Sequence, residues 1–360
     1  MSPPGRPKGE PRAREREGNP TGSDLPRVGI AVGDPAGVGP EIALKSALDP
    51  RVTRIARPVL FGDPRAVQAH AAACRIAATV RTFARPEEVT WSDGAVALVA
   101  LDHFRDDRFE LGAVRAAHGR AALDAARAAI DAALAGHVDA VVAAPQTELA
   151  IHQAGIEFDG YPSFVARCTG VAPEDAFLML CFDASRIVHA TLHVSLRRAI
   201  ELLTRSRVER VLRATHEALC RLGVGAPRIA VAGLNPHAGE AVLFGDDERE
   251  VFEPAMAAAR ADGIAADGPF GADTMLRRPG YDAFVVMYHD QGHIAAKLLA
   301  PNRTAGLTIG TPVLFSSVAH GSALDIAGQG RASAEAMVEA VARLVGAQPA
   351  SSVNEKRGVA

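Results

Sequence analysis

The sequence has few cysteines, no long apolar run and almost no excess of charge of either sign. Its four cysteines in 360 residues form no C-x-x-C pair, which favours reduced thiols over a disulfide framework or a zinc–thiolate site. No apolar run reaches the roughly 18 residues that a membrane-spanning helix needs. The formal net charge of −3 provides no general field for nucleic acid. We therefore expect a cytoplasmic globular protein with neither a nucleic-acid nor a membrane partner.

Both ends of the chain lack the pattern of a folded domain. Residues 1–27 are rich in proline, glycine, arginine and glutamate and contain no apolar run of a secretory signal. We expect a disordered tail here, or extra sequence from an upstream start codon. Residues 346–360 are expected to form a loose tail. Between them, residues 28–345 are long enough for one α/β unit or for two domains interleaved in sequence.

Short apolar runs alternate with longer amphipathic segments, which predicts an α/β fold. The expected strands are 27–32, 58–61, 95–100, 139–143, 283–287, 308–309 and 313–316, and the expected helices are 41–48, 113–135, 196–222, 248–260 and 332–345. Gly33-Asp34-Pro35-Ala36-Gly37-Val38-Gly39 connects the first strand to the first helix. It is neither a Walker loop nor a dinucleotide fingerprint, and its spacing favours a plain turn over a phosphate cradle.

Three histidines follow three strand-like runs. His193 follows 186–192, His237 follows 228–236 and His289 follows 281–288. Ligand sites of open α/β sheets lie at the carboxyl ends of strands, so three imidazoles there could hold one divalent metal. Each histidine taken alone is better explained as a structural residue.

The segments around these histidines leave alternatives open. His189 and His193 would share a strand face, which allows a second metal pair, although His189 lies within an apolar run that is typical of core. A helix with Asp290 as its N-cap would place His293 and Lys297 on one face. Lys297 could neutralise a carboxylate or assist proton transfer, or it could be an ordinary surface lysine.

A polar, glycine-bearing turn at 316–325 is expected to open another helix. Its backbone amides could bind an anion, and an ordinary capped helix start explains the pattern equally well. We take Gly321, Ser322 and Asp325 as candidate cofactor contacts.

Four motifs together resemble the 4-hydroxythreonine-4-phosphate dehydrogenase (PdxA) family. They are Gly33-Asp34-Pro35-Ala36-Gly37-Val38-Gly39-Pro40-Glu41-Ile42, Asn235-Pro236-His237-Ala238-Gly239-Glu240, Met287-Tyr288-His289-Asp290-Gln291-Gly292-His293 and His320-Gly321-Ser322-Ala323. The resemblance covers residues 28–344 and implies an isocitrate-dehydrogenase-like fold, with two interleaved α/β subdomains around a cleft.

The resemblance also implies an activity and its cofactors. Members form homodimers and use NAD to oxidise a hydroxyl beta to a carboxylate, often with loss of carbon dioxide. Their three metal histidines fall on His193, His237 and His289, in a site shared across the dimer. The metal could be zinc, magnesium, manganese, iron or cobalt. The substrate lysine is retained as Lys297, and Asp290 could orient a histidine or act as a base.

Departures from the family pattern indicate the substrate. The family's substrate-binding His-Thr pair is Tyr161-Pro162 here, and its phosphate-holding Asn and Arg align with Gly306 and Phe315. Losing the arginine removes a good phosphate ligand, and Phe315 would suit a flat ring. Together with the patterns at 150–156, 160–163, 191–193, 297–302 and 346–349, these changes are similar to the terephthalate dihydrodiol dehydrogenase branch, which forms protocatechuate.

Two other functions compete with this one. The first is the same chemistry on a phosphorylated threonine, threonate or erythronate, with another cation such as Arg303 binding the phosphate. The second is a non-catalytic metal- or ligand-binding protein. It is less favoured, because the histidines, the lysine and the glycine loops of the family pattern are all present together.

Overall fold

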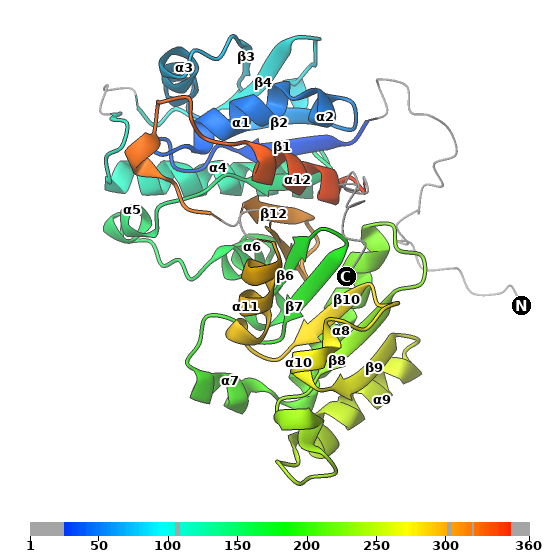
Figure 1. Ribbon diagram of the computed structural model, residues 1–360. Coiled ribbons are helices and arrows are strands. Elements are labelled where there is room, and N and C mark those ends of the chain that lie inside the picture. Colours follow the sequence, from blue (N-terminus) through cyan, green and yellow to red (C-terminus); the bar gives the residue numbers. More distant parts are fainter. Residues whose placement is uncertain (1–24, 105–108, 301–303, 319, 347–360) are drawn as a thin grey trace, which may run out of the picture.

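The computed structural model describes residues 25–104, 109–300, 304–318 and 320–346 (Figure 1). The expected tails lie outside these residues, except for 25–27 and Gly346, and so does Arg303. Among the described residues, no helix combines the length and the apolar character needed to cross a membrane.

One twelve-stranded sheet runs through the molecule in the order β3-β4-β2-β1-β5-β12-β11-β6-β7-β10-β8-β9. The strands are β1 (Arg27–Ala31), β2 (Arg57–Gly62), β3 (Thr79–Phe83), β4 (Ala95–Ala100), β5 (Ala140–Ala143), β6 (Phe177–Phe182), β7 (Ser185–His189), β8 (Arg228–Ala232), β9 (Ala265–Phe270), β10 (Ala283–Val286), β11 (Ala305–Ile309) and β12 (Phe315–Val318). All pairs are parallel except β6–β7, β6–β11 and β11–β12. The expected α/β class is confirmed.

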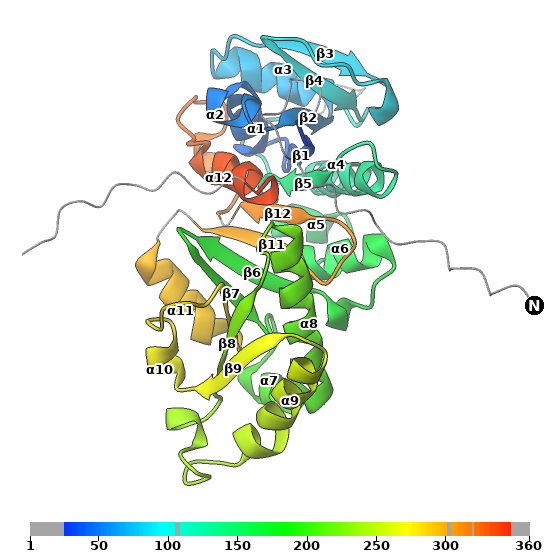
Figure 2. The same ribbon diagram turned by 90° about the vertical axis from the view of Figure 1, so that its right-hand side faces the viewer.

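Helices cover both halves of the sheet (Figures 1 and 2). They are α1 (Gly39–Leu48), α2 (Pro50–Thr53), α3 (Pro64–Ala73), α4 (Ala116–Leu134), α5 (Glu148–Gln153), α6 (Tyr161–Thr169), α7 (Leu196–Leu202), α8 (Arg205–Arg221), α9 (Glu253–Ala261), α10 (Ala272–Met275), α11 (His289–Leu299) and α12 (Glu335–Leu344). Burial explains the central strands: all four residues of β5 are buried apolar residues, as is typical of a parallel strand covered on both faces.

The chain crosses from one half of the sheet to the other and returns. β1 to β5 form the first half, and β6 to β11 form the second. β12 then pairs with β5, and α12 packs beside α1 (red beside blue in Figure 1). Residues 315–344, which hold β12 and α12, therefore belong with the first half, which makes the two halves interleaved in sequence.

Several expected boundaries were wrong. Residues 196–222 form two helices, because Thr204 ends the first run and caps α8 by accepting a hydrogen bond from the backbone N–H of Arg207. The segment expected as helix 248–260 begins with a π-helical turn, Glu248–Phe252, before α9. Of the segment 316–325, residues 316–318 belong to β12, and the helix expected after it is only a short 3-10 turn, Leu324–Ile326.

The N-cap expected at Asp290 was also wrong. Helix α11 begins at His289, and its N-cap is Tyr288, whose side chain makes no capping bond. Strand β7 ends at His189, so His193 lies in the chain beyond it, and the two histidines share no strand face.

Candidate active site

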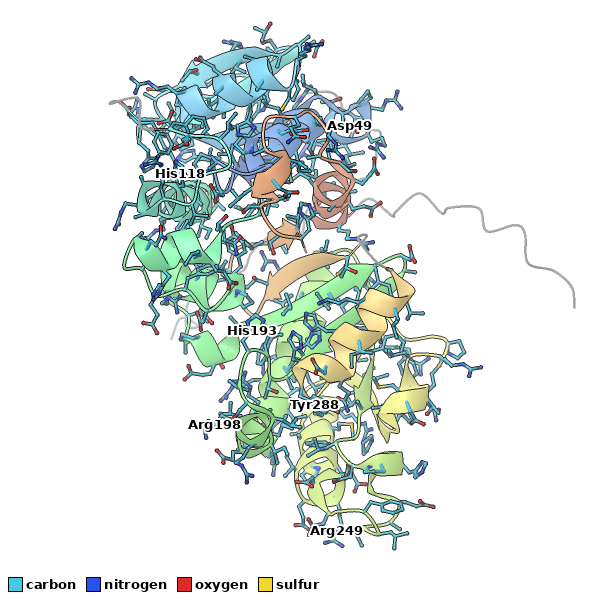
Figure 3. The ribbon with its side chains drawn as sticks, turned by 60° about the vertical axis from the view of Figure 1, so that its left-hand side comes forward. Asp49, His118, His193, Arg198, Arg249 and Tyr288 are labelled. Carbon is cyan, nitrogen blue, oxygen red and sulfur yellow. The ribbon has the colours of Figure 1, made fainter. Side chains whose placement is uncertain are left out.

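A cavity of about 1180 Å³ lies where the two halves of the sheet meet. Its walls come from the segment after β5, the start of α6, strands β6, β11 and β12, the segment after β7, helix α11 and residues 320–325. In Figure 3 the labelled His193 lies at this junction. The expected residues that line the cavity are Tyr161, Pro162, His193, His289, Lys297, Gly306, Gly321, Ser322 and Asp325.

His193 and His289 lie together in this cavity, with ring centroids 5.7 Å apart. The Nδ1 atom of His193 is 3.1 Å from the carbonyl oxygen of Asp159, and Nδ1 of His289 is 2.6 Å from Oδ1 of Asp290. Both partners are oxygen acceptors, so each Nδ1 carries the hydrogen and each Nε2 is left as a lone-pair donor. Metal-binding histidines are held by this kind of outer hydrogen bond, so the pair fits a divalent transition metal.

His237 does not join this pair within one chain. It is exposed in the turn Pro236–Gly239, and its ring packs 6.0 Å from Phe244. No group of three histidine, cysteine, aspartate or glutamate side chains in the described part of the chain is placed to hold a metal ion. One chain therefore brings together two of the three predicted ligands.

Side-chain hydrogen bonds connect the three strand exits that carry these histidines. The hydroxyl of Thr191 donates to the carbonyl oxygen of Met287 at 2.7 Å. Gln291 accepts from the backbone N–H of Met287 at 2.6 Å and donates to the carbonyl oxygen of Gly233 at 2.9 Å. The segments leading to His193, His289 and His237 are thus fixed to one another.

A buried carboxylate holds the segment that leads to His237. Oε1 of Glu248 accepts hydrogen bonds from the backbone N–H groups of Leu234 and Asn235, both at 2.8 Å, and Oε2 accepts from the Asn235 side chain at 3.0 Å. The following backbone is strained, because His237 has φ +53° and Val242 has φ +70°, in the region that favours glycine. Glu248 therefore anchors the strained loop at its start.

His293, which the sequence analysis did not assign to the site, lines the cavity. Its ring stacks on that of His289 with centroids 3.8 Å apart, and its Nδ1 is 3.1 Å from Nε2 of His189. Burial lowers the pKa of His293 to about 4 and that of His189 to about 3. The signal for His293 in the sequence was its spacing of four residues, about one helical turn, from His289. His189 itself is 1% exposed, as expected of core.

Lys297 is the only lysine or arginine among the described residues that line the cavity. It lies one turn beyond His293 on α11, as expected from the spacing of four residues. The carboxylate of Asp290 does not line the cavity. Its side chain is 70% exposed, and it contacts the metal-candidate His289 instead.

The residues that depart from the family pattern form an apolar wall. Tyr161 and Pro162 begin α6, and the hydroxyl of Tyr161 donates to the carbonyl oxygen of Ala144 at 3.3 Å. Burial raises the pKa of Tyr161. Phe315 is placed behind this wall rather than on it: it is 1% exposed and its ring lies 4.9 Å from that of Tyr161. A direct contact between Phe315 and a substrate in the cavity is therefore not supported, and Phe315 instead supports Tyr161.

The glycine loop supports the segment with the cofactor candidates. The backbone N–H of Val38 donates to the carbonyl oxygen of Ser322 at 2.8 Å, and a Cβ on Gly37 would lie 2.5 Å from that oxygen. The hydroxyls of Ser322 and Thr147 are 2.9 Å apart. No residue of 33–39 lines the cavity, which agrees with a plain turn.

A single α/β sheet with a largely apolar cavity that also presents histidines and one lysine is the arrangement of an α/β enzyme that acts on small molecules. The chain belongs to the PdxA family: residues 54–344 match the family described as pyridoxal phosphate biosynthetic protein PdxA. It is 41% identical over 323 residues to the 1,2-dihydroxy-3,5-cyclohexadiene-1,4-dicarboxylate dehydrogenase of Comamonas sp, covering 90% of this chain and 98% of that protein.

Two further relatives carry names of the phosphorylated-substrate type. A protein of Symbiobacterium thermophilum with the provisional name D-threonate 4-phosphate dehydrogenase is 40% identical over 335 residues, or 92% of this chain and 99% of that one. The crystal structure of 4-hydroxythreonine-4-phosphate dehydrogenase from Klebsiella pneumoniae superposes with a TM-score of 0.80 at 35% identity, covering 89% of this chain and 98% of that one. All three carry dehydrogenase names, and this chain is a dehydrogenase of the PdxA family.

Proposed function

We propose that this protein is an NAD-dependent, metal-assisted dehydrogenase that oxidises a terephthalate-type cis-dihydrodiol and releases carbon dioxide to give protocatechuate. The product has one carbon dioxide and two hydrogens fewer than the substrate. NAD accepts a hydride, and the remaining hydrogen leaves as a proton. The ketone formed beside the carboxylated carbon permits decarboxylation, and the ring then becomes aromatic.

The composition of the cavity wall carries this proposal. Leu178, Leu180 and Leu192 line it together with Tyr161 and Pro162, whereas Lys297 is its one cation among the described residues. An apolar wall suits a carbocycle. One lysine matches a single remote carboxylate better than a phosphate dianion, which proteins commonly hold with several donors.

We propose that His193 and His289 hold the metal through their Nε2 atoms, and that His237 of the second protomer completes the ligand set. When bound, the metal would stabilise negative charge on the substrate hydroxyl oxygen, and NAD would accept the hydride. The carboxylate of Asp290 keeps His289 in the tautomer that can ligate. An imidazole set favours zinc, iron or cobalt over magnesium.

Lys297 would bind the carboxylate remote from the reacting carbon. Tyr161 and Pro162 would pack against the ring, with Gly306 opposite. Gly306 has no side chain, and a larger residue would be crowded at this position, because its Cβ would lie 3.2 Å from Leu178. Gly321, Ser322 and Asp325, on the same cavity, are our candidates for NAD contacts.

Exposed apolar residues beside the site fit a homodimer. Leu243 and Phe244 follow His237 and are 71% and 46% exposed, and Leu298 on α11 is 78% exposed. Covering them with a second copy would bury apolar surface and bring His237 of one protomer toward the other protomer's cavity.

A substrate panel tests the activity. Purified enzyme with NAD and cobalt or zinc is given the cis-dihydrodiol dicarboxylate, 4-phosphohydroxythreonine or 4-phosphothreonate, and NADH and organic products are measured. We expect NADH and protocatechuate from the first compound. Preference for either phosphorylated compound would replace our proposal with the second candidate, and absence of NAD binding with retained metal would favour a non-catalytic binder.

Subunit complementation tests the shared metal site. His237→Ala and His289→Ala each remove a ligand, and each homodimer should be inactive. A mixed dimer regenerates one complete site of two, so random mixing of equal amounts should restore about a quarter of the wild-type activity. Restoration requires ligands from both chains. If mixing restores nothing although mixed dimers are detected, the site is not shared in this way.

A further inference from the structure

The orientation of His293 is determined by a chain of hydrogen bonds that begins at a backbone carbonyl. Nδ1 of the buried His189 is 3.3 Å from the carbonyl oxygen of Leu178 on the neighbouring strand β6. A carbonyl oxygen only accepts, so this nitrogen carries the hydrogen. In the neutral imidazole the other nitrogen, Nε2 of His189, is then a bare acceptor.

His293 must be the donor in the next step. Its Nδ1 is 3.1 Å from Nε2 of His189 and 3.2 Å from the carbonyl oxygen of His289, and both of these partners accept. Either contact alone places the hydrogen of His293 on Nδ1. Nε2 of His293 is therefore the unprotonated nitrogen, and it makes no hydrogen bond within the part of the chain that the structure describes.

We propose that His293 binds a hydroxyl of the substrate, with its Nε2 presented to the cavity as an acceptor and its tautomer fixed by His189. The inference rests on the proposed function to the extent that the substrate occupies this cavity. His189 acts as a positioning residue, because it reaches the cavity only through His293.

The pairing of His293 with Lys297 gives this acceptor its selectivity. Both residues line the cavity from one face of α11. A lone pair attracts a hydroxyl hydrogen and repels a carboxylate or phosphate oxygen, whereas the lysine ammonium does the opposite. One turn of helix thus presents separate sites for the hydroxyl and the anionic group of a hydroxy acid.

The tautomer is tested directly by NMR of protein labelled with ¹⁵N-histidine, in the presence and absence of zinc. Long-range ¹H–¹⁵N spectra distinguish protonated from bare ring nitrogens, and His293→Leu assigns the signals. We expect a protonated Nδ1 and a bare Nε2. A protonated Nε2 on His293 would overturn the proposal, and this result needs no ligand.

Selectivity for the hydroxyl is tested with matched probes in calorimetry. Protocatechuate is compared with benzoate, and 4-phosphothreonate with 4-phosphooxybutanoate, so that each pair differs only in hydroxyl groups. In metal-free wild-type protein, where no metal can bind a hydroxyl, the hydroxylated probe should bind about tenfold more tightly, and His293→Leu should remove that preference, as expected for one lost hydrogen bond. The surface variant His152→Leu, on α5, should keep it.

The role of His189 is tested by a conservative rescue. His189→Leu removes the acceptor for Nδ1 of His293 and should reduce the preference for the hydroxylated probe, whereas His189→Gln restores an acceptor and should recover most of it. A preference that survives His293→Leu contradicts the proposal. If wild-type protein binds neither probe pair, the proposed substrates are wrong, and the NMR result alone decides the tautomer.

Discussion

Gln291 donates a hydrogen bond from its side-chain amide to the carbonyl oxygen of Gly233, at 2.9 Å. The bond spans the exits of β10 and β8, and the same side chain accepts from the N–H of Met287. Gln291 itself ligates nothing in our proposal, yet it fixes the spacing between the segments that carry His289 and His237.

Replacement of Gln291 should weaken metal binding. In Gln291→Leu both hydrogen bonds are lost, and we expect the affinity for cobalt to fall by roughly tenfold or more, as for other outer-sphere changes. Gln291→Glu keeps the acceptor for Met287 and loses the donor to Gly233, so it should be intermediate. Cobalt titration followed by visible absorption measures this, with exposed Gln153→Leu as control. Unchanged affinity in Gln291→Leu would show that the bridge does not organise the site.

Replacement of Asp290 should also act through the metal. The Asp290 carboxylate holds Nδ1 of His289 at 2.6 Å. Asp290→Ala should lower metal affinity by about 10- to 100-fold, and Asp290→Asn, which keeps a neutral acceptor, should lower it less. The exposed Asp93→Ala serves as the control. Loss of turnover with full metal affinity would instead assign Asp290 a direct role in proton transfer.

Glu248 should matter for stability as well as for the site. Glu248→Ala leaves the buried N–H groups of Leu234 and Asn235 without their acceptor, and we expect about 2–4 kcal/mol lower free energy of unfolding. Urea denaturation measures this. Glu250→Ala removes an exposed ion pair with Arg249 and should change stability by less than about 1 kcal/mol. Equal effects of the two changes would contradict the anchoring role of Glu248.

His70 should make the fold less stable in mild acid. Burial lowers the pKa of its imidazole below the ordinary 6.5, and its Nε2 bonds the carbonyl oxygen of Pro35. Below pH 6.5 the unfolded chain binds the proton that the folded chain excludes, so stability is complete above this pH and declines as the pH falls. Urea denaturation of wild type and His70→Gln across this range should give a stability difference that changes with pH. A constant difference would show that His70 does not titrate on unfolding.

Apolar strands and cavity-lining residues could be predicted from the sequence more reliably than the contacts between residues that are distant in the chain. β4 is a continuous apolar run and appeared with its full bounds. β6 and β9 were missed, because their assignment depends on pairing with distant strands rather than on a local pattern. The break between α7 and α8 was missed because it depends on a single residue, Thr204, which caps α8.

The same contrast holds for the site, where individual lining residues were predicted but contacts between distant segments were not. Lys297, Tyr161 and Gly321 line the cavity as expected from their motifs. The separation of His237 from His193 and His289 could not be predicted, because strand ends alone do not reveal how far the following loop extends. His293 was missed for a related reason: its role comes from contact with His189, and those two residues are 104 positions apart in the chain.

The position of β12 has a consequence for how the molecule forms. This strand lies between β5 and β11 and is parallel to one and antiparallel to the other. During synthesis, the edges of β5 and β11 remain without their partner until residues 315–318 have left the ribosome. The halves of the cleft are therefore expected to be joined late, so a shortened chain that stops before Phe315 would expose two open edges and aggregate rather than fold.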